Sequence, residues 1–534
     1  MRLIHTTTLR FHEFEQPSSD VPPYAILSHT WGDEEVTFRD MSLDPTGAAT
    51  REKKGYDKIT QTCRLAREEN LEYVWIDACC IDKSSSAELS EAINSMFEWY
   101  ASSAGCYAFL FDYVPGDVGL ETCRWWTRGW TLQELLAPKR LVFYDSAWNA
   151  VGTKAALVEQ VSDITHIIAG VILDKSHLSR CSISQRMSWA ASRQTTRIED
   201  EAYCLLGIFG IHIPLIYGEG RMAFRRLQEE IIKRSADPTI FFWDTPAIKE
   251  DQPEFSSLFA ESPHAFRSAV NSGLTWLRFP EFIATNKGVL FSSVRELIEI
   301  RMAGEDHYTL YGFLHENGTD TRAIPLRKVG PGVFCRSGRF PLQRPNDYQI
   351  NGSPSGPSRF YIMPDPVPNL ETLIDRYRWR SIYVPKRIKL SDVAPRHLWD
   401  ATDRILISPP DLMQCDEGAA TIMGFENIIL ESPGFFVVNQ FFPLSRHCEL
   451  KLFQGTFFPD KITPHFRKYP ENLIPLSDLY KLTPNFDSLS NSVEVHLYGG
   501  GSVRIKVTTS EGILEPVPRT LHLRVLNFVV SPLN

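Results

Sequence analysis

The sequence contains no GxGxxG motif after a predicted strand and no Walker-type glycine loop, which argues against an ordinary dinucleotide or nucleoside triphosphate site. It also lacks a GxSxG nucleophile elbow and an HExxH motif, and its 14 histidines show no metal-ligand spacing. Any catalysis is therefore expected to depend on carboxylates and aromatic side chains, without a metal and without a bound cofactor.

Long apolar runs are missing as well. No run approaches the roughly 20 residues that span a bilayer, and the N-terminus lacks the apolar core of a signal peptide. The ten cysteines form no CxxC pair and lie mostly in apolar contexts, which is typical of free thiols in a reducing compartment. Cys79 and Cys80 would point to opposite faces of a strand, so we interpret them as small core residues and not as ligands of one metal. These features predict a cytoplasmic protein without a membrane span.

Basic charge is scarce too. The formal net charge of −9 argues against a general nucleic-acid binder, which needs positive charge to displace counterions. A length of 534 residues suffices for several domains of about 100–200 residues each. The 43% hydrophobic and 12% aromatic content is that of globular domains.

Residues 1–150 alternate between strand-like and helix-like segments. Apolar runs at 24–30, 73–77, 106–113 and 141–144 predict buried strands, and helices are predicted to begin near 56, 86 and 130. An edge strand is expected within 1–23 and irregular structure over 34–54. This order predicts a parallel sheet covered by helices, in which ligands bind beyond the carboxyl ends of the strands. That edge would carry six polar or aromatic side chains: His29, Trp31, Asp33, Asp77, Asp82 and Asp112.

The rest of the chain changes character twice. Residues 151–235 predict a helical extension, with helices over 183–193, 199–209 and 222–233. From 236 to 534, short apolar runs between prolines and glycines predict a β-rich region, for which a sandwich is one arrangement. Within it, 492–498 and 502–508 flank three glycines and predict a hairpin.

The stretch WWTRGWTLQELLAPKRLVFY (125–144) is the best candidate for chemistry. A helix is predicted over 130–136, because Pro138 cannot continue it, and it would place Trp130 and Glu134 on one face. An indole beside a carboxylate can hold a ring-shaped ligand and a developing positive charge. The alternative is an ordinary amphipathic helix with a packed tryptophan and a glutamate at its rim.

Several blocks, in order, resemble the heterokaryon incompatibility (HET) domain proteins of filamentous fungi. They are YAILSHTWGDEEVTFRDM (24–41), GYDKITQTCRLAREENLEYVWIDACCIDK (55–83), SEAINSMFEWYASSAGCYAFL (90–110) and RWWTRGWTLQELLAPKRLVFYD (124–145). Two further blocks, at 197–232 and 258–268, resemble the extension of the vegetative incompatibility subgroup. The resemblance spans roughly residues 1–290. It implies a HET domain over 1–150, its helical extension over 151–235 and a separate β-rich region over 236–534.

The resemblance also implies a role in non-self recognition and in regulated cell death, a form of fungal innate immunity. Many members of this family are death effectors that a partner or an attached sensor region switches on. The expected partners are therefore other incompatibility or sensor proteins, or a second copy of the chain.

HET domains are distantly similar to TIR domains, some of which cleave NAD⁺ at the nicotinamide–ribose bond. The TIR pattern Trp-x-x-x-Glu matches Trp130 to Glu134, and this likeness implies that Glu134 is the catalytic residue of a candidate NAD⁺ glycohydrolase. A carboxylate there would stabilise the ribosyl oxocarbenium ion or hold the ribose hydroxyls. The other expected substrate-binding residues are Trp31, Asp33, Asp77, Arg128 and Trp130.

Two functions remain open on the sequence alone. The first is a death effector that cleaves NAD⁺ as its substrate. The second is a non-enzymatic signalling scaffold whose HET domain self-associates and recruits partners, since many TIR domains are assembly modules.

Overall fold

The chain divides into two units. In the computed structural model the first comprises residues 1–249, 259–284 and 315–321, and the second comprises 250–258, 285–314 and 322–534. The structure describes residues 1–15, 21–244, 255–271, 281–292, 297–302, 310–317, 320–330, 332–338, 342, 348–350, 360–367, 382–385, 388, 390–394, 398–400, 404–406, 419–425, 435–442, 447–454, 474–475, 492–496, 502–513 and 522–532.

A seven-stranded sheet forms the core of the first unit. Its central strand, β3 (Tyr24–His29), is buried along its whole length, because a strand with neighbours on both sides and helices on both faces meets little water. The strand order is β2 (Phe11–Glu13), β1 (Arg2–His5), β4 (Tyr73–Trp75), β3, β5 (Gly105–Phe109), β6 (Leu141–Tyr144) and β7 (Ala150–Thr153).

The four central strands β4, β3, β5 and β6 run parallel, as the alternation of strands and helices predicts. The outer strands run antiparallel to their neighbours: β1 is antiparallel to β2 and β4, and β7 is antiparallel to β6. The sheet is therefore mixed, which corrects the expectation of a purely parallel one. The physical reason at both edges is length: β1–β2 and β6–β7 are joined by segments too short for the crossover that parallel neighbours need.

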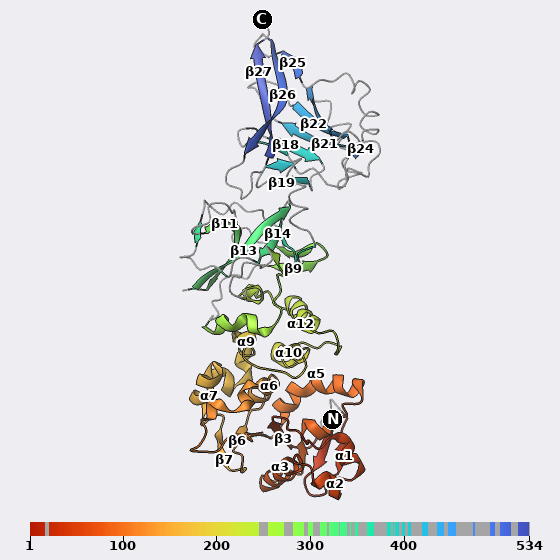
Figure 1. Ribbon diagram of the computed structural model, residues 1–534, viewed down its shortest axis with the longest axis vertical. Helices are drawn as coiled ribbons and strands as arrows, with labels where there is room; N and C mark the ends of the chain where they lie inside the picture. The colour runs from red at the N-terminus through yellow and green to blue at the C-terminus, as the bar shows by residue number, and fades with distance from the viewer. Residues whose placement is uncertain are drawn as a thin grey trace. The chain divides into compact units, whose positions relative to one another are not determined.

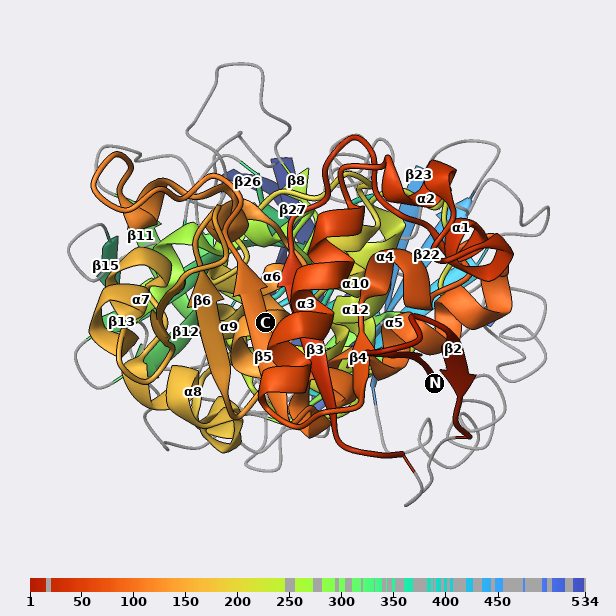
Figure 2. The same cartoon turned by 90° about the horizontal axis from the view of Figure 1, so that it is seen from below.

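Helices cover both faces of this sheet. In Figure 1, α3 (Tyr56–Glu68) lies below the sheet, and α5 (Ser86–Ser102) and α6 (Thr131–Leu136) lie above it. Figure 2 shows α3 in front of β5, β3 and β4. Helix α5 begins where predicted, because the Ser85 hydroxyl accepts from the Glu88 N–H at 3.3 Å. Its predicted core-facing stripe is buried: Ile93, Met96, Phe97 and Tyr100.

Two predictions in this unit were wrong. Residues 34–54 are not irregular, since they contain α1 (Phe38–Leu43) and α2 (Ala48–Arg51), and Thr37 and Asp40 form a capping box at the start of α1. Cys79 and Cys80 do not lie on a strand, because β4 ends at Trp75 and the chain turns into α4 (Asp77–Cys80). A helical turn this short shows no periodicity in the sequence. Both cysteines are buried, so their interpretation as core residues holds.

The segment after the sheet is mainly helical, but its helices are shorter than predicted. The expected helix over 183–193 ends at residue 188, and the one over 199–209 is broken at Cys204 and Leu205, whereas the last is nearly as predicted. The helices are α7 (Val158–Thr165), α8 (Ala169–Leu173), α9 (Ile183–Ser188), α10 (Asp200–Tyr203), α11 (Leu206–Phe209) and α12 (Met222–Ile232).

Beyond residue 254 the described chain is mainly strand, arranged in three sheets. A nine-stranded sheet contains β15 (Tyr348–Ile350), β11 (Leu297–Met302), β12 (Leu310–Asn317), β13 (Asp320–Gly330), β14 (Val333–Ser337), β16 (Phe360–Ile362), β10 (Gly288–Phe291) and β9 (Phe282–Thr285), with β8 (Phe255–Ser256) paired to β14. A six-stranded sheet contains β19 (Trp399–Asp400), β20 (Ile405–Leu406), β17 (Ile382–Tyr383), β27 (His522–Pro532), β26 (Ser502–Ile513) and β25 (Ser492–His496). A five-stranded sheet contains β18 (Leu390–Ala394), β21 (Ala419–Phe425), β22 (Phe435–Phe442) and β23 (His447–Gln454), with β24 (Ile474–Pro475) paired to β21.

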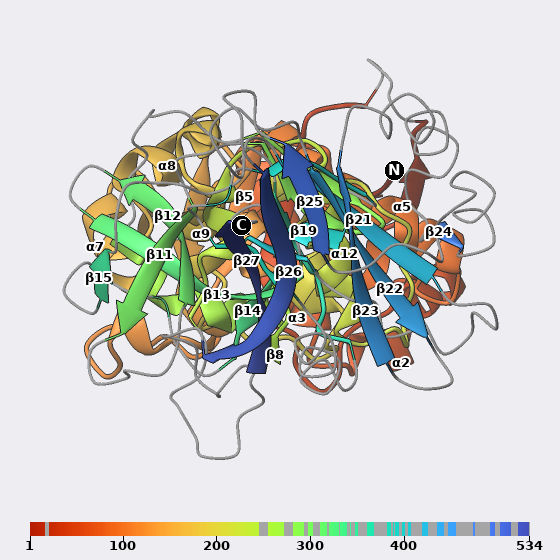
Figure 3. The ribbon, with the colours of Figure 1, turned by 90° about the horizontal axis from the view of Figure 1, so that it is seen from above.

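The last two sheets share one apolar core, to which β17 and β26 contribute from one sheet and β21 and β22 from the other. Figure 3 shows β25, β26 and β27 side by side, and likewise β21, β22 and β23. The predicted hairpin is present, since β25 and β26 pair antiparallel from Ser492 with Lys506 to His496 with Ser502. Its three-glycine turn lies outside the described residues. The parallel pairing of β17 with β27 makes this a mixed-sheet region.

Candidate active site

The strand order of the first unit creates a switch point. The parallel strands follow one another in the chain as β3, β4, β5 and β6, but in the sheet β3 lies between β4 and β5. The chain thus leaves β3 to one side and later returns on the other, and open α/β sheets bind ligands beyond the carboxyl ends of such strands. His29 ends β3, and Asp77 starts the helical turn after β4.

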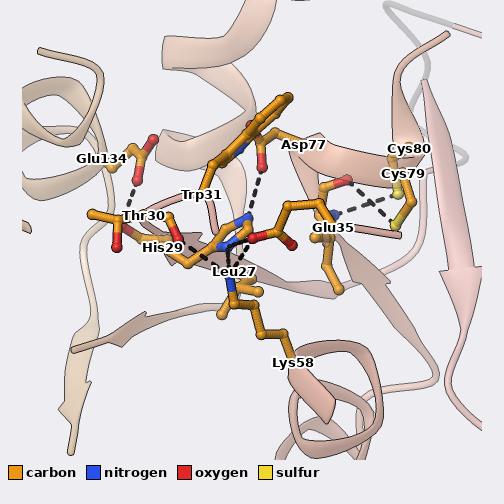
Figure 4. Close-up of polar contacts among 12 residues, drawn as sticks. Leu27, His29, Thr30, Trp31, Glu35, Lys58, Asp77, Cys79, Cys80 and Glu134 are labelled. Atoms are coloured by element: carbon orange, nitrogen blue, oxygen red, sulfur yellow. Dashed lines mark hydrogen bonds and ion pairs between the residues drawn. The ribbon is translucent and has the colours of Figure 1, made fainter. Parts of the chain in front are cut away.

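His29 is the centre of a polar network at this edge (Figure 4). Its side chain is only 1% exposed, and its Nε2 lies 3.0 Å from Oδ1 of Asp77. On the other side of the ring, Nδ1 lies 3.1 Å from Nζ of Lys58, a residue of α3. The Lys58 ammonium also donates to the Thr30 carbonyl at 3.1 Å and forms an ion pair with Glu35. The network thus ties the end of β3 to α3, to α4 and to the loop after β3.

The partners of His29 determine its tautomer. An ammonium group can only donate, so Nδ1 accepts from Lys58, and Nε2 carries the hydrogen that Asp77 accepts. Burial raises the pKa of Asp77, but the Lys83 charge and the hydrogen bonds from His29 and Trp31 outweigh it, so that the pKa lies below its usual range. Asp77 is therefore a carboxylate at neutral pH, with its two oxygens held by different donors.

Trp31 is the exposed member of this group. Its indole Nε1 donates to Oδ2 of Asp77 at 2.9 Å, and 41% of the residue is accessible to solvent. The Lys83 ammonium lies 3.3 Å from the centre of the ring, in a cation–π contact. A tryptophan held flat by a carboxylate and a cation, at the carboxyl edge of a parallel sheet, is suited to stacking against a planar ligand.

Glu134 lies on the other face of β3. Successive residues of a strand point to opposite faces, so Ser28 faces α6 whereas His29 faces α3. The Ser28 hydroxyl donates to Oε2 of Glu134 and accepts from Nε1 of Trp125 at 2.9 Å. Trp125 lies in the 3-10 helix Arg124–Thr127 and is fully buried.

Glu134 is itself 6% exposed. Burial raises its pKa to about 8, although the hydrogen bond from Ser28 acts in the opposite direction. The raised pKa favours the protonated form of Glu134 at neutral pH. A buried carboxyl with a strongly raised pKa is a candidate functional group, because such pKa shifts are concentrated at functional sites.

The remaining predicted residues are placed unequally. Trp130 precedes α6, whose last residue is Leu136 as predicted, and its indole donates to Asp200. Trp130 and Glu134 therefore sit one helical turn apart but hold different partners. Arg128 reaches the Thr196 hydroxyl at 3.3 Å, and its charge acts on Glu134. Asp33 lies exposed in the loop after β3, and no described hydrogen bond ties it to the network.

Sequence reasoning placed His29 at this edge but not in the site, and it missed Ser28, Lys58 and Trp125 as site residues. The alternation of side chains along β3 could have found Ser28, because a serine beside a histidine in an otherwise apolar strand requires a buried partner. Lys58 and Trp125 carry no such signal, since a lysine on an amphipathic helix and a tryptophan in an aromatic run are common.

Among the described residues, no three His, Cys, Asp or Glu side chains are grouped to hold a metal ion. No helix within the described ranges is both long and apolar enough to cross a membrane.

Comparisons with known proteins agree with the resemblance in the sequence. Residues 24–115 match the family model described as heterokaryon incompatibility protein (HET), and residues 222–276 match a domain of unknown function, DUF8212. The chain is 46% identical over 230 residues to the vegetative incompatibility protein HET-E-1 of Podospora anserina. That alignment covers 41% of this chain but only 17% of HET-E-1, so the chain spans a small part of its relative. No solved structure matches it.

The matched HET region begins with β3 and extends past β5, so it contains Ser28, His29, Trp31 and Asp77 and stops short of Glu134. The polar network around His29 thus lies within the part of the chain that matches the HET family model. The chain thus contains a HET domain and is homologous, over 230 residues, to the vegetative incompatibility protein HET-E-1.

Proposed function

We propose that this protein is an intracellular cell-death effector of non-self recognition, and that its HET domain cleaves NAD⁺ at the nicotinamide–ribose bond. The observation that carries the proposal is the burial of Glu134 against β3, the strand at the switch point of the sheet, where burial raises the pKa of its carboxyl. Trp31 and Asp77 lie at the same edge and would bind the substrate.

The charge of the substrate gives Glu134 a role. The nicotinamide ring of NAD⁺ is cationic, and a positive charge near a carboxyl lowers its pKa. Binding would therefore release the Glu134 proton to solvent, and the carboxylate would then face the ribose as the bond between C1′ and the ring nitrogen breaks. The bonding electrons leave with neutral nicotinamide, and the carboxylate stabilises the remaining oxocarbenium ion. Water then adds to C1′, and its proton returns to Glu134 or to solvent, which yields ADP-ribose.

The other residues would orient the substrate. The exposed face of the Trp31 indole suits stacking of a planar ring, since Lys83 occupies the opposite face. Arg128 would pair with a phosphate oxygen of the diphosphate, after giving up the long contact to Thr196. Asp33, which is exposed, would contact only the outer part of a bound molecule.

A second function, a non-enzymatic scaffold, is favoured by a different observation. The loop after β5 exposes three apolar side chains: Phe111 (44%), Val114 (41%) and Val118 (39%). Such residues can bind a second copy of the chain or another incompatibility or sensor protein. Under this proposal Glu134 is a buried group that stabilises the packing of α6 on β3.

Nicotinamide release from NAD⁺ by the purified full-length chain, at high protein concentration, separates the two proposals. Glu134→Gln keeps the size of the side chain and removes its ability to ionise, and Glu91→Gln makes the same change at an exposed position of α5. Release by the parent and by Glu91→Gln, but not by folded Glu134→Gln, is expected of the enzyme. No release from any of the three, even under enforced oligomerisation, would refute the enzyme and favour the scaffold. In that case, polar substitutions at the three apolar positions should abolish self-association.

A further inference from the structure

Two buried oxygen atoms at the carboxyl edge of the first sheet have no hydrogen-bond partner among the described residues. One is Oγ1 of Thr30, a residue that directly follows β3 and is 4% exposed. The other is Oδ1 of Asp112, in the loop after β5. A buried polar atom without a partner costs free energy, and such atoms are rare in folded proteins. Each of these oxygens therefore requires an explanation.

The two residues follow neighbouring strands. β3 and β5 pair in parallel, with His29 opposite Phe109, so both strands end at the same edge of the sheet. In sheets of this order, ligands bind between the ends of the first and third parallel strands of the chain, which here are β3 and β5. The unpartnered oxygens thus come from the two loops that flank the expected binding position.

Hydrogen bonds connect the two loops. Oδ2 of Asp112 accepts from the Arg124 N–H at 2.8 Å, which fixes the carboxyl group and leaves Oδ1 for another donor. The next residue, Trp125, donates from Nε1 to the Ser28 hydroxyl at 2.9 Å. Thr30 is two positions after Ser28, so the alternation of side chains along a strand predicts that both lie on the same face of the sheet.

We propose that Thr30 and Asp112 bind the vicinal hydroxyl groups of a ribose. An ionised carboxyl can only accept a hydrogen bond, whereas a threonine hydroxyl can both donate and accept. A vicinal diol satisfies both residues, because one hydroxyl donates to Oδ1 of Asp112 while its neighbour accepts from Oγ1 of Thr30. A phosphate group does not, because it would face a carboxylate of the same charge.

The ribose contact deepens the proposed function, and only the assignment of the diol to NAD⁺ rests on that function. Ser28 donates to Glu134, so the face on which we expect Thr30 is also the face of Glu134. A ribose held there would lie beside the carboxyl group that is proposed to stabilise its cation. Thr30 and Asp112 would act by binding the sugar and not by acid–base chemistry.

The test is isothermal titration calorimetry of ADP-ribose with the full-length chain. ADP-ribose contains both riboses of NAD⁺ but no bond to nicotinamide, so it binds without turnover. Asp112→Asn keeps an oxygen for the Arg124 N–H and replaces the other oxygen by a donor, which should weaken binding by about 10-fold or more. Thr30→Val replaces the hydroxyl by a methyl group and should weaken binding by about 3- to 10-fold. Asp117→Asn, at an exposed position of the same loop, is the control and should bind as the parent does.

AMP distinguishes the two riboses, because it carries only that of adenosine. If Asp112→Asn weakens the binding of AMP and of ADP-ribose alike, the bound diol is that of adenosine. If it weakens only the binding of ADP-ribose, the bound diol belongs to the ribose from which nicotinamide is cleaved. Either result supports the proposal.

Thermal unfolding gives a second readout. The Thr30 hydroxyl makes no hydrogen bond among the described residues, so Thr30→Val should unfold no earlier than the parent although it binds ADP-ribose less tightly. A structural role, or an ordered water on this hydroxyl, would instead lower stability and leave the affinity unchanged.

Affinities of both variants within about twofold of the parent's, or no binding of ADP-ribose to the parent, would overturn the proposal. Binding requires no catalysis, so this failure and a failure to release nicotinamide are separate results. A chain that binds ADP-ribose through Thr30 and Asp112 but releases no nicotinamide would keep the ribose site and lose the proposed activity. An enzyme whose variants bind unchanged would keep Glu134 as the catalytic residue and lose the ribose site.

Discussion

Replacement of Glu134 by glutamine should change how the stability of the first unit depends on pH. The ordinary pKa of a glutamate is 4.5, and burial raises that of Glu134 to about 8. Between these two values the folded state keeps a proton that the unfolded state has lost, so stability falls as pH rises. The stabilisation that comes from the raised pKa is complete below pH 4.5 and is lost as pH passes through 8. From pH 5 to pH 8 the loss amounts to roughly 3 to 4 kcal/mol.

Glutamine does not titrate, so the difference in unfolding free energy between parent and Glu134→Gln isolates this residue. Other titrating groups, such as Asp77, cancel in that difference. The variant should gain roughly 3 to 4 kcal/mol relative to the parent between pH 5 and pH 8, and the difference should level off above pH 8.

Urea denaturation followed by tryptophan fluorescence measures the change in the correct unit, because nine of the twelve tryptophans precede residue 250. The curves of parent and variant are compared at constant ionic strength, with Glu91→Gln as the exposed control. A difference that stays constant from pH 5 to pH 9 would mean that Glu134 is ionised throughout. The reasoning from burial would then be wrong.

Three further substitutions test other parts of the fold. Lys58→Met should destabilise the first unit by about 3 kcal/mol, because the Glu35 carboxylate, whose side chain is only 10% exposed, loses its ammonium partner. Lys54→Met removes only an exposed ion pair and should cost under about 1 kcal/mol in the same urea assay. Asp77 has a lowered pKa, so the stability that its carboxylate provides is present above pH 3.8 and is lost as the pH falls below that value. Asp77→Asn should therefore reduce the loss of stability at acidic pH. An unchanged loss at acidic pH would contradict the assignment. Gly207→Ala would place a Cβ 2.2 Å from the Cβ of Phe97 on α5, so thermal unfolding should show a loss of stability of about 2 kcal/mol. A melting temperature within a degree of the parent's would contradict this close packing.

Much of the first unit could be predicted from the sequence, because its signals are local. The apolar run of β3 and the stripe of α5 follow directly from residue spacing, and Pro138 limits α6. Short turns were not predictable in this way. The helical turn of α4 and the split between α10 and α11 depend on packing against the rest of the unit, which no single-chain pattern records.

The direction of the outer strands was also not predictable. An apolar run near the N-terminus predicts a strand. It does not predict that β1 pairs antiparallel with β4, because the paired residues are about 70 positions apart in the sequence. Similarly, the pairing of β17 with β27 joins residues about 140 positions apart. Such partners are selected by the whole chain as it buries apolar surface and pairs backbone groups.

The sequence by itself determined the presence of a HET domain, the α/β character of the N-terminal unit and the position of Glu134 on a helix between two strands. Tertiary structure alone decided that Ser28 lies between Trp125 and Glu134, and that His29 meets Lys58 on the opposite face of the same strand. The reason is physical: a local pattern specifies which elements form and which faces are apolar. The protonation and hydrogen bonding of a buried group depend instead on the side chains that distant elements bring within about 3 Å of it.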